Sequence, residues 1–269
     1  MRRTVVLAPG MPEVCRLGLA TRGNTHLKSV DVLRAVERGV NYLNWCGHPD
    51  GLSSAVAGMG IARRQVVVAA QFQARSAREA EREFDSMLHE LKTDYIDVLT
   101  LYYVESQGEW DELIAPGGAW EYLAKQKRCG RLKMIGLTSH QRALAAEWAQ
   151  SEKLDLLMIR YNAAHRGAER DVFPVTKIPV VTFTGLRWKA LLDRTPDDPL
   201  GSAPPSAVEC YRFCLAHPAV AVALAAPGNR AELDEDLALL DDWRAPDEPA
   251  RESLRAHGDR VRKNAGVFW

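Results

Sequence analysis

Four side chains that could move protons lie at the ends of short apolar runs or in the loops that directly follow them. Tyr102 and His140 each stand at the end of such a run, and His48 and Asp50 share the loop after another. Phenol, imidazole and carboxyl groups are the usual general acids and bases of enzymes, provided that the fold brings them together. These residue types make acid–base catalysis at a shared site one hypothesis; the alternative for His140 is helix capping or a hydrogen bond within its loop, and for His48 and Asp50 it is a solvated loop.

A metal site is the alternative use of one of these loops. Cys46, His48 and Asp50 offer thiolate, imidazole and carboxylate ligands at alternating positions. Such triplets are usually solvated loop residues, and the five cysteines show no Cys-x-x-Cys spacing. We therefore expect reduced thiols and no metal.

The candidate residues need a scaffold that brings distant loops together. Short β-branched runs alternate with amphipathic helical stretches, which is typical of parallel strands joined by right-handed crossovers. The clearest helix follows Ser76, which forms a capping box with Glu79 ahead of apolar residues at helical spacing. The expected strands are 15–21, 41–46, 65–72, 96–104, 132–139, 156–162, 179–184 and 220–226.

Eight strand–helix pairs in one chain predict the α/β class and a (β/α)8 TIM barrel, which needs about 250 residues. We expect a single domain over residues 1–269, with a short hairpin at 4–12 across the barrel floor and an extra helix at 248–265. The stretch 193–205 is rich in Pro, Asp and Gly, so we expect a mobile loop near the ligand. Barrel enzymes place their chemistry in the loops that follow the strands.

Aromatic residues stand at several of these expected strand ends. Trp45, Tyr102, Tyr103, Phe183 and Trp188 would surround the barrel mouth and favour an aromatic or bulky apolar ligand. The alternative for the two tyrosines is packing within the barrel wall.

Composition and charge exclude several classes of partner. Lys and Arg total 35, as do Asp and Glu, so there is no basic excess for nucleic acid or an acidic membrane. No run approaches the roughly 18 apolar residues of a membrane helix, and the apolar stretch 5–8 is too short for a secretory signal. We expect a cytoplasmic protein that binds small molecules, in an oligomeric state that the sequence leaves open.

Several segments resemble the aldo-keto reductases in order and spacing. Residues 35–46, Ala-Val-Glu-Arg-Gly-Val-Asn-Tyr-Leu-Asn-Trp-Cys, are similar to the segment that carries the family's catalytic Asp. Residues 91–97, Leu-Lys-Thr-Asp-Tyr-Ile-Asp, and 130–136, Gly-Arg-Leu-Lys-Met-Ile-Gly, look like the starts of its fourth and fifth strands. Residues 227–236 look like its NADP-binding stretch, and the resemblance spans about 14–245.

The resemblance implies carbonyl reduction by four residues. In the family a Tyr donates the proton, Lys and Asp tune its pKa, and His orients the carbonyl. This sequence departs at each position, with Asn44 in place of Asp, Pro49 in place of Tyr, Gln71 in place of Lys and Tyr102 in place of His.

Another donor must therefore replace the missing Tyr. Tyr102 is the preferred acid and His48 the second choice. A phenol pKa near 10 would have to be lowered for efficient donation at neutral pH. Gln71 can orient the donor but cannot supply the charge of a Lys, and no Lys lies between Lys28 and Lys92.

The resemblance also implies NADP as cofactor. Ser139 stands where the family hydrogen-bonds the nicotinamide carboxamide, His140 replaces the Asn that follows, and Phe183 takes the place of the stacking ring. Met158 replaces the family's carboxamide-binding Gln. Residues 184–187, from Thr184 to Arg187, stand where loop groups meet the pyrophosphate.

The resemblance also implies that residues near the C-terminus bind the adenosine side of NADP. Asn229 and Arg230 are placed to reach the 2′-phosphate, for which a guanidinium fork suits the geometry. Asp236 replaces the family's adenine-side Asn.

The leading hypothesis is an NADP-dependent oxidoreductase of aldo-keto reductase type that acts on a small carbonyl compound with an altered proton donor. Two alternatives remain. A lyase, isomerase or hydrolase could use His48, Asp50, Tyr102 and His140 at the same mouth, since barrels host many chemistries. The chain could also bind NADP without turnover.

Overall fold

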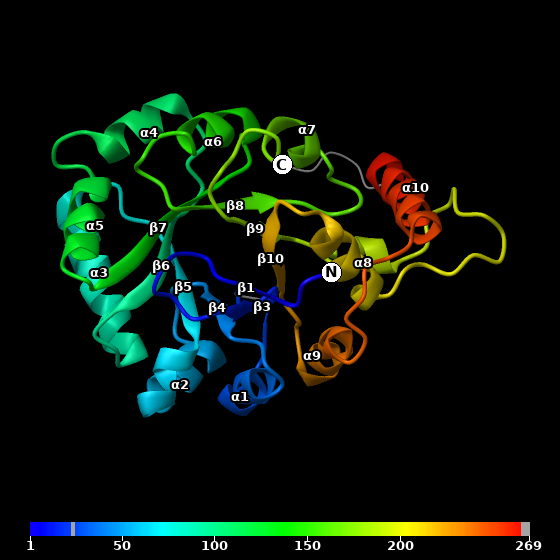
Figure 1. Ribbon diagram of the computed structural model, residues 1–269, viewed down its shortest axis with the longest axis horizontal. Coiled ribbons are helices and arrows are strands. Elements are labelled where there is room, and N and C mark those ends of the chain that lie inside the picture. Colours follow the sequence, from blue (N-terminus) through cyan, green and yellow to red (C-terminus); the bar gives the residue numbers. More distant parts are fainter. Residues whose placement is uncertain (23–24, 265–269) are drawn as a thin grey trace.

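A closed barrel of eight parallel strands forms the centre of the computed structural model, which describes residues 1–22 and 25–264. The helices ring the strands on the outside (Figure 1). This confirms the predicted (β/α)8 fold. Around the barrel the order is β10 (Val220–Ala225), β3 (Leu17–Ala20), β4 (Tyr42–Trp45), β5 (Val67–Phe72), β6 (Ile96–Leu101), β7 (Leu132–Ser139), β8 (Leu156–Arg160) and β9 (Val180–Phe183).

The outer layer consists of α-helices with short 3-10 helices between some of them. The predicted helix after Ser76 is confirmed, and the Ser76 hydroxyl and the Glu79 carboxylate close the expected capping box. The helices are α1 (Ser29–Glu37), α2 (Gly51–Gly58), η1 (Gly60–Gln65), α3 (Ala77–Leu91), α4 (Gln107–Ile114), α5 (Ala119–Arg128), α6 (Arg142–Trp148), α7 (Ala168–Asp171), η2 (Ala190–Leu192), α8 (Ala207–Ala216), α9 (Arg230–Leu237), η3 (Ala238–Leu240) and α10 (Glu248–Asn264).

The strands are buried on both faces, so they read as nearly continuous apolar runs. Alternate residues belong to two apolar layers. In β5, Val67 packs inside the barrel, whereas Val68 packs against the helices. This period of two decides which side chain at each strand end can face the barrel mouth.

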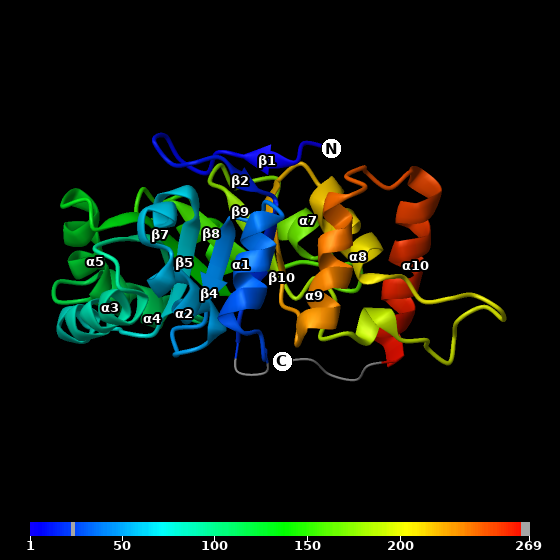
Figure 2. The ribbon, with the colours of Figure 1, turned by 90° about the horizontal axis from the view of Figure 1, so that it is seen from below.

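The N-terminal hairpin is present, but its second strand lies where we expected the first barrel strand to begin. β1 (Thr4–Val5) pairs antiparallel with β2 (Val14–Cys15), and the barrel strand starts at Leu17. The hairpin lies across one end of the barrel (Figure 2), where Leu7 and Met11 pack against the barrel interior. These apolar contacts close the floor.

The C-terminal helix α10 packs outside the barrel beside α8 and η2 (Figure 1). Ala265, the last residue of the predicted helix, lies outside the described residues. The loop 193–205, expected to be mobile, is tied to α10, because the Asp198 carboxylate accepts a hydrogen bond of 2.6 Å from Arg260. No described helix is both long enough and apolar enough to cross a membrane.

Candidate functional site

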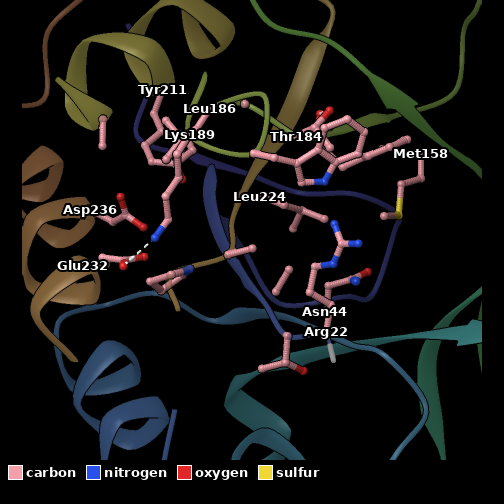
Figure 3. A pocket seen from close by; sticks show the side chains of 18 of the residues that line it. Arg22, Asn44, Met158, Thr184, Leu186, Lys189, Tyr211, Leu224, Glu232 and Asp236 are labelled. Carbon is pink, nitrogen blue, oxygen red and sulfur yellow. Dashed lines mark hydrogen bonds and ion pairs between the residues drawn. The ribbon is translucent and has the colours of Figure 1, made fainter. Parts of the chain in front are cut away.

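A pocket of about 350 Å³ opens at the carboxyl-terminal ends of the barrel strands (Figure 3). Its walls come from residues in or just beyond seven strands, β3 to β6 and β8 to β10, from the loop after β9, and from α8 and α9. Active sites of (β/α)8 enzymes lie at this end of the barrel, where loops from different strands meet. The volume suits a small-molecule ligand.

Three of the predicted catalytic residues line this pocket. Asn44 follows the interior residue Tyr42 by two positions, and Gln71 follows Val67 and Ala69 at the same period, so both polar side chains end an inward-facing row. Tyr102 joins them directly beyond β6, where its backbone N–H donates to the carbonyl of Phe72 on β5 at 2.9 Å. Parallel register thus brings Asn44, Gln71 and Tyr102 from three adjacent strands to one mouth.

The surroundings of Tyr102 differ from what efficient proton donation requires. Burial raises the pKa of the phenol, a hydrogen bond with Tyr103 raises it further, and the positive charge of Arg22 works in the opposite direction. The rings of Tyr102 and Tyr103 lie 4.0 Å apart between centroids. Tyr102 is therefore a stable hydrogen-bond donor whose proton is held more tightly than the sequence-based hypothesis needs.

Ser139, the last residue of β7, and His140, which follows it, lie behind the pocket wall. Ser139 is buried, and its hydroxyl accepts the backbone N–H of Gln141 at 3.0 Å. The His140 ring lies 4.6 Å from Tyr103 and 5.9 Å from Phe183 between centroids. Burial lowers the pKa of His140 to about 4, so the imidazole is neutral at pH 7. Neither residue is part of the pocket lining.

The loop after β9 holds an unusual backbone. Thr184, Arg187, Trp188 and Lys189 all have φ between 50° and 74°, a left-handed region that non-glycine residues rarely occupy and that clusters at functional sites. Thr184, Trp188 and Lys189 line the pocket together with Phe183.

Arg187, the residue of this loop that we expected to bind an anion, is directed away from the pocket. The guanidinium of Arg187 is buried and donates to the backbone carbonyl of Val261 on α10 at 2.9 Å. It is not among the residues that line the pocket. The contact joins the β9 loop to the C-terminal helix.

Helix α9 forms the wall of the pocket opposite Asn44 (Figure 3). Asn229 caps the helix by accepting the N–H of Glu232, and the Arg230 guanidinium contacts the carboxylates of Asp31 at 2.9 Å and Asp234 at 3.4 Å. Neither Asn229 nor Arg230 lines the pocket, whereas Asp236 does.

The carboxyl of Asp236 is almost fully buried in this wall. Burial raises its pKa to about 8, with additional repulsion from Glu232 and Glu235, although a hydrogen bond from Tyr211 opposes the shift. Asp236 is thus mostly neutral at pH 7. In that state it presents both a donor and an acceptor, as an amide would.

The loop with His48 and Asp50 serves the local fold. The Asp50 carboxylate caps α2 through the N–H groups of Leu52 and Ser53, each at 2.8 Å, and the His48 carbonyl accepts the Trp45 indole N–H at 2.7 Å. None of these residues lines the pocket. Within residues 1–22 and 25–264, no group of three His, Cys, Asp or Glu side chains could hold a metal.

A sequence model of the Aldo/keto reductase family matches residues 17–187, more than half of the chain. The chain belongs to the aldo/keto reductase family. No curated protein sequence matches it significantly.

Solved structures show the same fold for this aldo/keto reductase family member. An aldo-keto reductase from Bacillus halodurans, in its holo form, is 16% identical with a TM-score of 0.76, covering 95% of this chain and 96% of that one. One from Klebsiella pneumoniae in complex with NADPH is 18% identical with a TM-score of 0.73, covering 92% of each chain. One from Brucella melitensis is 17% identical with a TM-score of 0.68, covering 94% and 97%.

Two cationic side chains that line the pocket were not predicted from the sequence. Arg22 lies two positions beyond Ala20, the last inward-facing residue of β3, so the period of two could have found it. Lys189 owes its place to the left-handed loop after β9 and pairs with Glu232 at 2.7 Å. No sequence pattern marks that position.

Proposed function

We propose that this chain is an NADP-dependent oxidoreductase that reduces a carbonyl compound, with Tyr102 in place of the family's usual proton donor. The observation that carries the proposal is the shared pocket, which is lined by Asn44, Gln71 and Tyr102 together with Phe183 and Asp236. Membership of the aldo/keto reductase family supports the same reaction.

The pocket fits a nicotinamide dinucleotide. Phe183 offers an aromatic ring at one wall, Lys189 a cation beside the loop, and Asp236 a neutral, amide-like carboxyl at the far wall. We propose that Phe183 and Thr184 hold the nicotinamide side and that Asp236 binds the adenine side. NADP and NADPH occupy two reductase structures from Klebsiella pneumoniae with this fold.

The 2′-phosphate is proposed to meet Asn229 and Arg230. Because Arg230 already contacts Asp31 and Asp234, a phosphate there would have to share the guanidinium with these carboxylates. Ser139 and His140 would support the nicotinamide wall from behind, and Arg187 would hold the loop that meets the pyrophosphate.

When bound, the cofactor supplies a hydride. The chain's own residues then have to orient the carbonyl and deliver a proton to its oxygen. We propose that the Tyr102 hydroxyl hydrogen-bonds this oxygen and that Gln71 helps to orient it. His48 is the weaker candidate, because it does not line the pocket. Since the pKa of Tyr102 is raised, proton transfer should be slower than from an activated phenol.

An aromatic or bulky apolar substrate fits the lining best. Tyr102, Tyr103, Phe183 and Trp188 all contribute rings to the pocket. Trp45, which we also expected there, is fully buried and packs with the helix-facing layer of the barrel.

One observation favours a second candidate, NADP binding without turnover: the raised pKa of Tyr102. Titration of the protein's tryptophan fluorescence with NADPH and NADH, followed by assay of carbonyl-dependent NADPH oxidation, separates the two. Binding with oxidation supports the reductase. Binding without oxidation of any carbonyl supports the second candidate, and no binding of either nucleotide contradicts both.

A further inference from the structure

One end of the pocket holds a buried amide that the protein leaves unsatisfied. The Asn44 side chain is 1% exposed, and neither its amide oxygen nor its amide nitrogen has a hydrogen-bond partner among the described residues. Buried polar groups without partners are costly and rare in native proteins, so each one calls for a ligand or a water. Asn44 lines the pocket, so a pocket ligand can supply the missing partner.

Arg22 lies at the same end of the pocket. It follows β3, and its guanidinium points into the pocket near Asn44 in Figure 3. No carboxylate of the described chain lies within ion-pairing distance of this side chain. Lys189, in contrast, is already paired with Glu232 at 2.7 Å. Arg22 is therefore the cation of this pocket that is available to a ligand.

The distribution of charge separates the two sides of the pocket. Glu232 and Asp236 lie on the side of α9, opposite Arg22 and Asn44 in Figure 3. On the side of Arg22, the Asn44 amide nitrogen is a buried donor that has no partner among the described residues. A planar guanidinium matches the two oxygens of a carboxylate, and neighbouring donors strengthen such binding.

We infer that the carbonyl compound reduced in this pocket is an oxo acid, whose carboxylate is bound by Arg22 and Asn44. The inference rests on the proposed reductase function and names its substrate class. The rings of Tyr103, Phe183 and Trp188 would contact the apolar body of the substrate. A phosphate of the dinucleotide offers similar anionic chemistry, so the test must distinguish the two sources.

Two nearly isosteric aldehydes provide the test, 4-carboxybenzaldehyde and 4-carbamoylbenzaldehyde. We expect the parent protein to show a kcat/KM about 10-fold higher for the carboxylate, and the ratio to fall to about one in Arg22→Gln. Arg22→Lys should keep an intermediate ratio, because it retains the charge but not the fork. Arg78→Gln, an exposed site on α3, is the matched control and should keep the parental ratio.

Nucleotide binding identifies the other anion source. An unchanged NADPH dissociation constant in Arg22→Gln, together with the loss of the substrate ratio, supports the inference. If the ratio is retained, the inference is wrong. If both aldehydes lose rate equally and NADPH binds more weakly, Arg22 binds a cofactor phosphate and the oxo acid assignment is wrong.

Failure of the reductase proposal can be recognised separately. If no carbonyl is reduced, calorimetric titration with benzoate and benzamide still tests the anion site, in the presence and absence of NADP. Benzoate binding that is about 10-fold tighter than benzamide binding in the parent, and equal to it in Arg22→Gln, would support the carboxylate site alone. Equal binding of both compounds by the parent would overturn it.

Discussion

Replacing Asp236 by Asn should make the protein more stable, and increasingly so as the pH rises. The folded-state pKa of this carboxyl is about 8, against an ordinary value of 3.8. Between these values the folded state binds more protons than the unfolded state, so Asp236 lowers stability progressively with rising pH. The loss is complete above the folded-state pKa. The substitution keeps the shape of the side chain but removes its titration.

The magnitude follows from the pKa shift. Each pH unit of unequal proton binding changes the free energy of unfolding by about 1.4 kcal/mol, so the advantage of Asp236→Asn should grow by about 2–3 kcal/mol between pH 6 and pH 8.5. Urea unfolding, followed by tryptophan fluorescence at several pH values, measures this difference. Asp94→Asn, at an exposed site, is the control and should track the parent.

The same pair of proteins tests the nucleotide site. NADPH binding by the parent should weaken as the pH rises through about 8, since an ionised carboxylate loses the donor that a neutral carboxyl offers. Asp236→Asn should bind NADPH without that pH dependence. Parallel stability curves for Asp236→Asn and the parent would refute the reasoning, because they would mean that Asp236 is ionised in the folded protein at pH 7.

Two further substitutions test the supporting structure. Arg187→Ala should destabilise the protein by about 2–4 kcal/mol in urea unfolding, because it removes a buried guanidinium and its bond to Val261; weaker NADPH binding at unchanged stability would instead favour a direct pyrophosphate role. Ser76→Ala should cost about 1 kcal/mol by the same measurement through loss of the α3 cap, whereas Ser76→Asp should retain most of the stability. A loss from Ser76→Ala below about 0.3 kcal/mol would argue against the capping box as a stabilising feature.

The barrel could be predicted because its signals are local and repeated. Each strand is buried on both faces and reads as an apolar run. The Ser76–Glu79 capping box marks the start of α3. The start of the first barrel strand could not be found in this way. Val14 and Cys15 are apolar, as Leu17 and Leu19 are, and it is their pairing with β1 that assigns them to the hairpin.

The candidate site was predicted in part, and side-chain direction accounts for the difference. Asn44 and Gln71 share the inward-facing period of their strands, whereas Trp45 and Ser139 fall on the opposite period and face away from the pocket. Tyr103 was expected at the mouth and does line the pocket, although it directly follows Tyr102. Its backbone is left-handed, with φ of 47°, a conformation that no pattern in the sequence indicates.

The direction of the Arg187 side chain also depends on a local backbone conformation. Its left-handed backbone, with φ of 50°, accompanies a side chain that is directed toward α10, and Lys189 becomes the cation at the pocket wall. The motif resemblance identified the loop but could not assign which of its cations faces the ligand.

Carbonyl-dependent oxidation of NADPH by the parent protein and by Tyr102→Phe tests the central claim most directly. The change removes only the hydroxyl oxygen, so nucleotide binding should persist. We predict that the parent oxidises NADPH in the presence of an aromatic aldehyde and that Tyr102→Phe is slower by about 10²–10⁴-fold. An equal rate in both proteins would contradict Tyr102 as proton donor, and absence of NADPH binding by the parent would contradict the account as a whole.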